Sequence, residues 1–296
     1  MKKITWKNIV TGTIFIVFFV LNQCFLMGKY EDIRQQISQV MGILLLGIGI
    51  WCFLPKKVYS EIKSKKKLSK LTLVSLAIVI VLIPLTILFG VYFLKDRKYY
   101  FISLLVVLEA IVPFIVAFEK RRPKAREIVI ISVLCALAIC GRVIFSAFPQ
   151  FKPVIAVVII SGLCFGGEAG FLVGTITAFV SNFFFGQGPF TPWQMFAYGI
   201  VGFLAGILFN GGLLKGKKVW ISVFGFFATT VISGVILNSA SVILWQPNPT
   251  LEMFISACVL GLPFDIVHGA STAFFLMFIT EPLVTKIERI KVKYGI

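Results

Sequence analysis

Charged residues are scarce in this chain, and acidic ones are scarcer than basic ones. Charged side chains make up 14% of the 296 residues and hydrophobic ones 58%, with 12 acidic residues and a single histidine. A soluble domain of this length carries far more charge, so the composition argues against one. The six cysteines form no C-x-x-C pair and lie in apolar stretches, where a free cysteine packs like a small hydrophobic residue.

What the chain has instead is a series of long apolar runs, most of them near the 20 residues that a helix needs to cross a bilayer. We predict an all-α integral membrane protein with about ten transmembrane helices. The sixth run is too short for an ordinary crossing, so we expect it to be tilted or incomplete. The runs are Asn8–Met27, Ile37–Leu54, Leu71–Leu94, Tyr99–Phe118, Glu127–Ala147, Pro153–Cys164, Glu168–Phe185, Trp193–Leu214, Val219–Leu244 and Leu251–Thr280.

The excess of basic residues, 29 against 12 acidic ones, could indicate a nucleic-acid partner. Their positions argue for a topology signal instead, because most of them fall in alternate joints between the apolar runs, such as Lys63–Lys70 and Lys120–Arg126. Basic residues concentrate on the cytoplasmic side of membrane proteins. We therefore predict a multi-pass cell-membrane protein with both termini in the cytoplasm and no nucleic-acid partner. Attraction to anionic headgroups of the lipid bilayer is a secondary expectation.

The two parts of the chain differ in character. Residues 1–126 form an extension of four predicted helices joined by lysine-rich segments, whereas residues 127–296 carry glycine, serine, threonine and asparagine within their predicted helices. Small residues let membrane helices approach closely. We therefore expect residues 127–296 to be a tightly packed six-helix module and the first part to be an appended bundle.

Three segments that connect the predicted helices of the second module combine polar residues, aromatic residues and proline. They are Phe148–Lys152, Gly186–Pro192 and Trp245–Thr250. The predicted orientation places all three outside the cell. Irregular chain at a membrane boundary has backbone groups that lipid cannot satisfy, so it must be buried in protein or line a cavity. A small-molecule pocket needs apolar walls with a few oriented polar groups, and this side of the module supplies both.

Neutral amide side chains gather near these joints, with aromatic residues beside them. They offer hydrogen-bond donors and acceptors but no carboxylate cluster for a metal ion, which suits a large, mostly neutral ligand bearing amides or rings. Trp245 is explained as well by a membrane anchor as by a pocket, whereas the position of Trp193 favours the pocket. The amides are Asn182, Gln187, Gln194, Asn238 and Gln246.

Arg142, Asp265 and His268 are ionisable residues within predicted membrane helices. A charge there needs a partner or a wet cavity, so Arg142 either faces a pocket or snorkels to the outer interface. Asp265 and His268 are three positions apart and share one helix face. They are consistent with a hydrogen-bonded pair that locks helices together, with ligand contact or gating, or with acid–base catalysis; they are too few for a metal site.

Ser132, Ala136 and Cys140 recur every four residues and make one helix face flat enough for close docking, either within this chain or with a second protein. Gly211–Lys218 nearly spells a phosphate-binding loop, but Lys218 stands where a serine or threonine must hold magnesium, and the segment lies between membrane helices. We predict a basic turn there, and no cofactor or ATPase activity in this chain.

Several motifs together resemble the substrate-binding S components of energy-coupling factor (ECF) vitamin transporters. The likeness covers about Glu127–Thr280 and is greatest to the branch associated with cobalamin or its precursors, such as dimethylbenzimidazole. The motifs are Gly141-Arg142, Lys152-Pro153, Gly166–Gly174, Ser181-Asn182, Phe184–Gln194 and Pro263–His268.

The resemblance implies six core helices with the vitamin held under the outer loops. It implies a membrane coupling subunit and two cytosolic ATPases as partners, and release of the vitamin inside when the S component reorients in the bilayer. It places the coupling-subunit contact on Ser132, Ala136 and Cys140, where family members often carry an Ala-xxx-Ala stripe. The expected substrate-binding residues, none of them catalytic, are Arg142, Lys152, Asn182, Gln187, Trp193, Gln194, Asn238, Gln246, Asp265 and His268.

Three alternatives stay open at this point. The chain could be an S component for another vitamin, such as a riboflavin-like heterocycle. It could be a solitary ion-coupled transporter, although charged residues within the predicted helices are few. It could also be an intramembrane enzyme that uses Asp265 and His268, in which case the only histidine of the chain would be indispensable for turnover.

Overall fold

The computed structural model describes residues 123–210, 217–246 and 249–295, together with the single positions Leu85, Leu105, Glu109 and Phe118. Apart from these four positions, the predicted N-terminal helices lie outside the described residues, and so does the turn at residues 211–216. The division of the chain at residue 126 therefore stays a prediction.

The described segments are helical, and they fall where the six apolar runs of the second module predict helices. Helices α6, α7 and α8 span Ala125–Ile144, Val154–Phe165 and Gly167–Phe185. Helix α9, Thr191–Ala205, continues as the π-helical turn η2, Gly206–Asn210; α10, Lys218–Phe227, continues through the π-helical turn η3, Ala228–Ser233, into α11, Gly234–Trp245. The last helix, α12, spans Leu251–Tyr294. When η2 is counted with α9, and η3 with α10 and α11, five helices in the described segments are long and apolar enough to cross a membrane.

The end of the last helix differs from the prediction. The last helix continues past Thr280 to Tyr294, so the basic C-terminal tail is helical rather than a plain joint. Its C-terminal residues are held against the start of α6, because Lys124 Nζ donates to the carbonyl of Gly295 and the Arg126 guanidinium lies 5.0 Å from the Tyr294 ring. These contacts give the tail a partner that apolar periodicity alone does not reveal.

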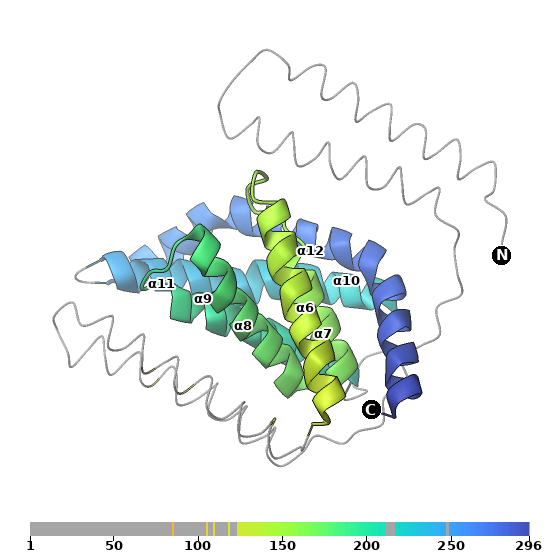
Figure 1. Ribbon diagram of the computed structural model, residues 1–296. Helices are drawn as coiled ribbons and strands as arrows, with labels where there is room; N and C mark the ends of the chain where they lie inside the picture. The colour runs from red at the N-terminus through yellow and green to blue at the C-terminus, as the bar shows by residue number, and fades with distance from the viewer. Residues whose placement is uncertain are drawn as a thin grey trace, which may run out of the picture.

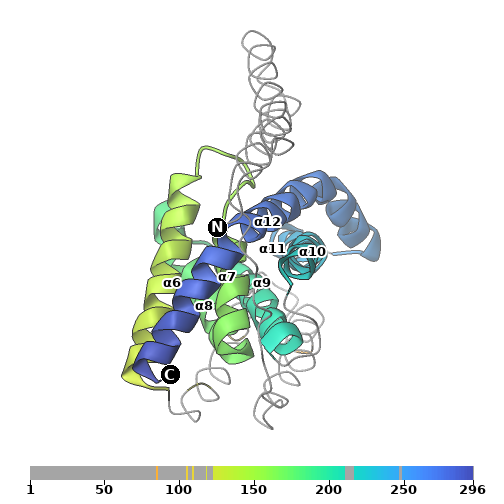
Figure 2. The ribbon, with the colours of Figure 1, turned by 90° about the vertical axis from the view of Figure 1, so that its right-hand side faces the viewer.

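The helices form two crossing groups (Figures 1 and 2). Helices α6 to α9 lie side by side, while α10, α11 and the first part of α12 cross them steeply. Helix α12 then bends and runs back toward the start of α6. Pro263 and Pro282 lie inside α12, and a proline removes a backbone hydrogen bond and bends a helix there.

The short helix α7 is the centre of the module. All of its 12 residues are buried, and it packs against α6, α8, α9 and α12. A helix enclosed by protein on every side needs no full membrane span, which explains why the sixth apolar run is short. The joint to α8 is the single residue Gly166, whose φ of +97° is a conformation that glycine adopts without strain.

Glycines bring α7, α8 and α9 into contact. A Cβ added to Gly162 or Gly170 would overlap the carbonyl oxygen of Gly202, and one added to Gly202 would overlap the carbonyl of Gly170. Small residues allow such backbone contact between membrane helices. The close packing predicted for this module is therefore confirmed at these three helices, which form a rigid base for the loops at one end.

Candidate functional site

Arg142 lies in the last turn of α6 and points into the helix bundle. Its side chain is 7% exposed. Its Nη1 donates to Ser181 Oγ and, at 2.8 Å, to Asn182 Oδ1, both on α8 and both fully buried. Of the two orientations considered for this arginine, snorkelling to the interface is therefore wrong. The charge is held inside the protein by two neutral acceptors.

The loop between α8 and α9 is fastened to this arginine through Asn182 and Thr191. Asn182 Nδ2 donates to Thr191 Oγ1 at 3.2 Å, and Thr191 Oγ1 donates to Gln187 Oε1 at 2.9 Å. The backbone N–H of Gly188 donates to Thr191 Oγ1 at 3.2 Å, and Gln187 Nε2 donates to the carbonyl of Phe179 at 2.9 Å. This set of bonds satisfies the irregular chain, as such a loop requires. We call Arg142, Ser181, Asn182, Gln187 and Thr191 the loop network.

Lys152 lies in the loop between α6 and α7 and reaches the end of α8. Its Nζ is 5.1 Å from the centroid of the Phe185 ring, and the Arg142 guanidinium carbon is 4.7 Å from the same centroid. Partial burial, and then the neighbouring charge of Arg142, lower the pKa of Lys152. Two cations that repel each other thus lie near one aromatic ring, which attracts both.

Trp193 and Gln194 occupy the first turn of α9 and face the crossing helices. Trp193 is 4% exposed and packs with Ala240 and Ile243 of α11. In the described structure Trp193 Nε1 and Gln194 Oε1 are buried and have no hydrogen-bond partner. Gln194 Nε2 donates to the Tyr198 hydroxyl at 3.3 Å. A buried polar atom without a partner is unfavourable, so each of these two atoms needs a partner that the described residues do not supply.

Asn238 and Asp265, two of the remaining predicted residues, contact each other. Asn238 Nδ2 donates to Asp265 Oδ2 at 2.7 Å, which joins α11 to α12. The His268 ring is buried and lies 6.4 Å from the Tyr198 ring, and among the described residues it forms no hydrogen bond with Asp265. The predicted option of a bonded Asp265–His268 pair is therefore wrong. Gln246 is exposed just beyond α11.

Four residues that the structure places here were not among the predicted substrate-binding residues: Ser181, Phe185, Thr191 and Tyr198. The first three stand inside the motifs Ser181-Asn182 and Phe184–Gln194, next to residues that were selected for their amide or charge. Tyr198 is one helical turn after Gln194, on the same face of α9. That spacing is the only signal in the sequence that could have found it.

Comparison with known proteins identifies the chain. Residues 126–282, which run from the start of α6 to the Pro282 bend of α12, match the family model of the ECF transporter substrate-specific component.

The chain belongs to this family.

The family is one of membrane transport subunits that determine the substrate, rather than of enzymes, and its members act with ECF ATPase and membrane subunits.

Curated relatives of this S component share low identity with it. A UPF0397 protein from Vibrio atlanticus is 28% identical over 124 residues, which are 40% of this chain and 68% of the relative. UPF0397 proteins from Aliivibrio salmonicida and Aliivibrio fischeri are each 28% identical over 149 residues, or 46% of this chain and 80% of the relative. No solved structure matches the chain.

The small-residue stripe of the S component lies on an exposed face of α6. Ser132, Ala136 and Cys140 are all exposed, between exposed hydrophobic residues such as Val133 and Leu137. The prediction left the partner of this stripe open between this chain and a second protein. No helix of the described module covers it.

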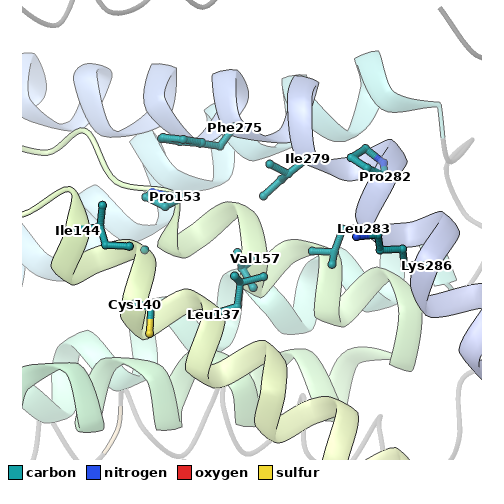
Figure 3. Close-up of a pocket in the computed structure, with 11 residues that line it drawn as sticks. Leu137, Cys140, Ile144, Pro153, Val157, Phe275, Ile279, Pro282, Leu283 and Lys286 are labelled. Carbon is teal, nitrogen blue, oxygen red and sulfur yellow. The ribbon is translucent and has the colours of Figure 1, made fainter. Parts of the chain in front are cut away.

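A groove with a volume of about 390 Å³ opens beside this stripe, between α6, α7 and α12 (Figure 3). Apart from Lys286 and Cys140, the residues that line it are apolar or glycine, and none of them is a predicted substrate-binding residue. A vitamin pocket needs several oriented polar groups. The groove therefore belongs to the apolar outer surface of the module rather than to the loop network. It is lined by Leu137, Cys140, Gly141, Ile144, Pro153, Val157, Phe275, Ile279, Pro282, Leu283 and Lys286.

Proposed function

We propose that this S component captures a vitamin, cobalamin or a precursor such as dimethylbenzimidazole, from outside the cell and releases it inside. A coupling subunit in the membrane and two cytosolic ATPases drive its reorientation in the bilayer. The end of the module that carries the loop network, which we call the loop end, faces outward, and both termini lie in the cytoplasm. The loop end consists of residues 145–153 and 186–190 with the adjoining helix ends.

The observation that carries this proposal is the polar environment of the loop end. The loop network holds an irregular loop in place over Trp193 and Gln194, each of which keeps a buried polar atom without a protein partner in the described structure. A ligand with complementary hydrogen-bonding groups would satisfy both atoms. Aromatic walls with a few oriented donors and acceptors are the usual lining of a vitamin site.

The exposed stripe on α6 supports the proposed partner. Ser132, Ala136 and Cys140 leave a flat strip that a neighbouring membrane helix can approach closely, and the apolar groove next to it extends the contact surface. We assign this face to the coupling subunit. In this assignment, the residues that bind the vitamin are separate from those that contact the coupling subunit.

The first experiment identifies the ligand. The S component is purified from cells grown in rich medium, and any bound small molecule is identified by mass spectrometry. A corrinoid or a benzimidazole precursor supports the cobalamin branch, whereas a flavin-like heterocycle assigns the chain to another vitamin. Absence of any ligand, both on purification and on titration with these compounds, would contradict a role in vitamin capture.

The second experiment tests the site. Asn182→Ala and Trp193→Ala should each abolish binding of the identified ligand in calorimetric titration, because one releases the loop and the other removes the wall beneath it. Thr285→Ala, a change at an exposed position of α12, is the control. Wild-type affinity in both site variants would show that the loop end is not the binding site.

The third experiment tests the energy source. Uptake of labelled ligand is compared between a host with ECF ATPases and one without them. Uptake only in the first host is expected. Equal uptake in both hosts would favour a solitary ion-coupled transporter.

A further inference from the structure

Two cations at the loop end meet at one aromatic ring. Lys152 Nζ and the Arg142 guanidinium carbon lie 5.1 Å and 4.7 Å from the centroid of the Phe185 ring. Residues from three separate parts of the chain, the end of α6, the loop before α7 and the end of α8, thus converge at this point.

This cluster has no acidic partner in the described part of the chain. The ion pairs described there join Lys218 to Glu281 and Lys291 to Glu288. Asp265 accepts a hydrogen bond from Asn238, and neither its carboxylate nor any other described one pairs with Arg142 or Lys152. The acceptors that do contact Arg142 are neutral. The loop end therefore carries an uncompensated positive charge.

Both cations retain hydrogen-bond donors. The two hydrogen bonds of Arg142 leave from Nη1, and its guanidinium has further N–H groups on Nη2 and Nε. The Lys152 ammonium has only the Phe185 ring as its side-chain partner among the described residues. Two neighbouring, partly desolvated cations repel each other, and an anion between them removes the repulsion. Arginine and lysine are the side chains that proteins use to bind carboxylate and phosphate.

We propose that the ligand of this S component carries a carboxylate or phosphate group, which Lys152 and Arg142 bind beside Phe185. The proposal rests on the proposed function and narrows its substrate class. Among cobalamin and its precursors it favours compounds with a phosphate ester over the free benzimidazole base. It also revises the mostly neutral ligand that the amide side chains suggested.

The test uses ligand pairs that differ only by a phosphate. The purified full-length S component is titrated with α-ribazole and α-ribazole phosphate, with cobinamide and cobinamide phosphate, and with riboflavin and flavin mononucleotide. In the pair that contains the recognised ring system, the phosphorylated compound should bind at least about tenfold more tightly, as expected for a charge-assisted hydrogen bond. The ligand identified by mass spectrometry should itself contain a phosphate or a carboxylate.

Two variants assign the preference to the cations. Lys152→Met should remove most of the preference by weakening only the phosphorylated compound, while Lys293→Met, the same change at an exposed lysine of α12, should leave it intact. Arg142→Lys keeps the charge but loses the planar fork, so it should weaken binding of the phosphorylated compound. The double variant Lys152→Met/Arg142→Lys should weaken this binding further. Thermal unfolding of each variant verifies that it is folded.

The outcomes separate this inference from the function on which it rests. Equal affinity for both members of the pair that binds, unchanged in Lys152→Met, would overturn the anion site and leave vitamin capture standing. A purified ligand without a carboxylate or phosphate would do the same. Failure of all six compounds, together with the absence of any purified ligand, would overturn both.

Discussion

The two ends of the helix module use their basic residues in opposite ways. At the loop end, Arg142 and Lys152 face an aromatic ring and neutral acceptors. At the other end, which we call the basic end, Lys291 Nζ donates to the carbonyl of Cys164 at 2.8 Å and to Glu288 Oε1 at 2.9 Å. Lys124 there donates to the carbonyl of Gly295.

The difference indicates which charges serve the fold and which are free for a ligand. At the basic end the lysines bind carbonyl groups at the ends of α7 and α12, where helices leave carbonyls without intrahelical partners. Those charges hold the C-terminal segment of α12 against the end of α7 and the start of α6. At the loop end the charges have no acidic partner among the described residues, so they stay available.

The largest expected effect is at the loop end. Arg142→Ala should abolish ligand binding and destabilise the protein, because Asn182 Oδ1 is left buried without its donor, at a cost of about 1–3 kcal/mol. Titration calorimetry and thermal unfolding measure the two effects. Arg126→Ala, at the basic end, is the matched control and should retain binding. Wild-type affinity in Arg142→Ala would break the contrast between the two ends.

A change on the exposed face of α6 should separate binding from coupling. In Ala136→Leu the larger side chain prevents close approach of a partner helix, so uptake and co-purification with the coupling subunit should be lost while ligand affinity stays unchanged. Val259→Ala, which makes an exposed side chain of α12 outside the groove smaller, is the control for non-specific effects. Full uptake by Ala136→Leu would remove the stripe from the proposed interface.

Trp193→Phe should lower affinity more than stability. The variant removes a buried N–H that has no partner in the described protein, and this gain offsets part of the packing that the smaller ring loses against Ala240 and Ile243. Ligand affinity should fall about tenfold if the ligand accepts a hydrogen bond from that N–H. Unfolding and titration are measured on the same preparation. An unchanged affinity would show that Nε1 does not face the ligand.

The smallest effect is expected at the basic end. Lys291→Ala loses the bonds to the Cys164 carbonyl and to Glu288, and because the side chain is partly exposed, stability should fall by only about 1 kcal/mol. Ligand affinity should not change. A large loss of affinity would mean that the basic end takes part in binding and would blur the distinction between the two ends.

Apolar length and loop composition predicted much of this molecule. The six helices of the described module fall at the predicted runs, because the need to satisfy backbone groups in lipid leaves the helix as the main option for such runs. The loop motif at Gly186–Pro192 indicated the end of the module at which Asn182 and Gln187 both form a hydrogen bond with Thr191. The family itself followed from the same motifs.

Other features depended on contacts between distant helices. The α12 tail is held against α6 by Lys124 and Arg126, and α7 is fully buried because four neighbouring helices enclose it. Asp265 binds Asn238, 27 positions earlier, rather than His268 on its own helix face. Helical periodicity shows which residues share a face but not which face of which helix lies opposite.

The sequence by itself determined that this protein is a bundle of membrane helices with a polar, aromatic loop at one end, because hydrophobicity and backbone hydrogen bonding act locally along the chain. Only the tertiary structure decided that Arg142, Lys152 and Phe185 meet there, and that the lysines of the opposite end are occupied by carbonyl and carboxylate groups. Charge balance at a site is a property of neighbours in space, and the linear order of residues does not contain it.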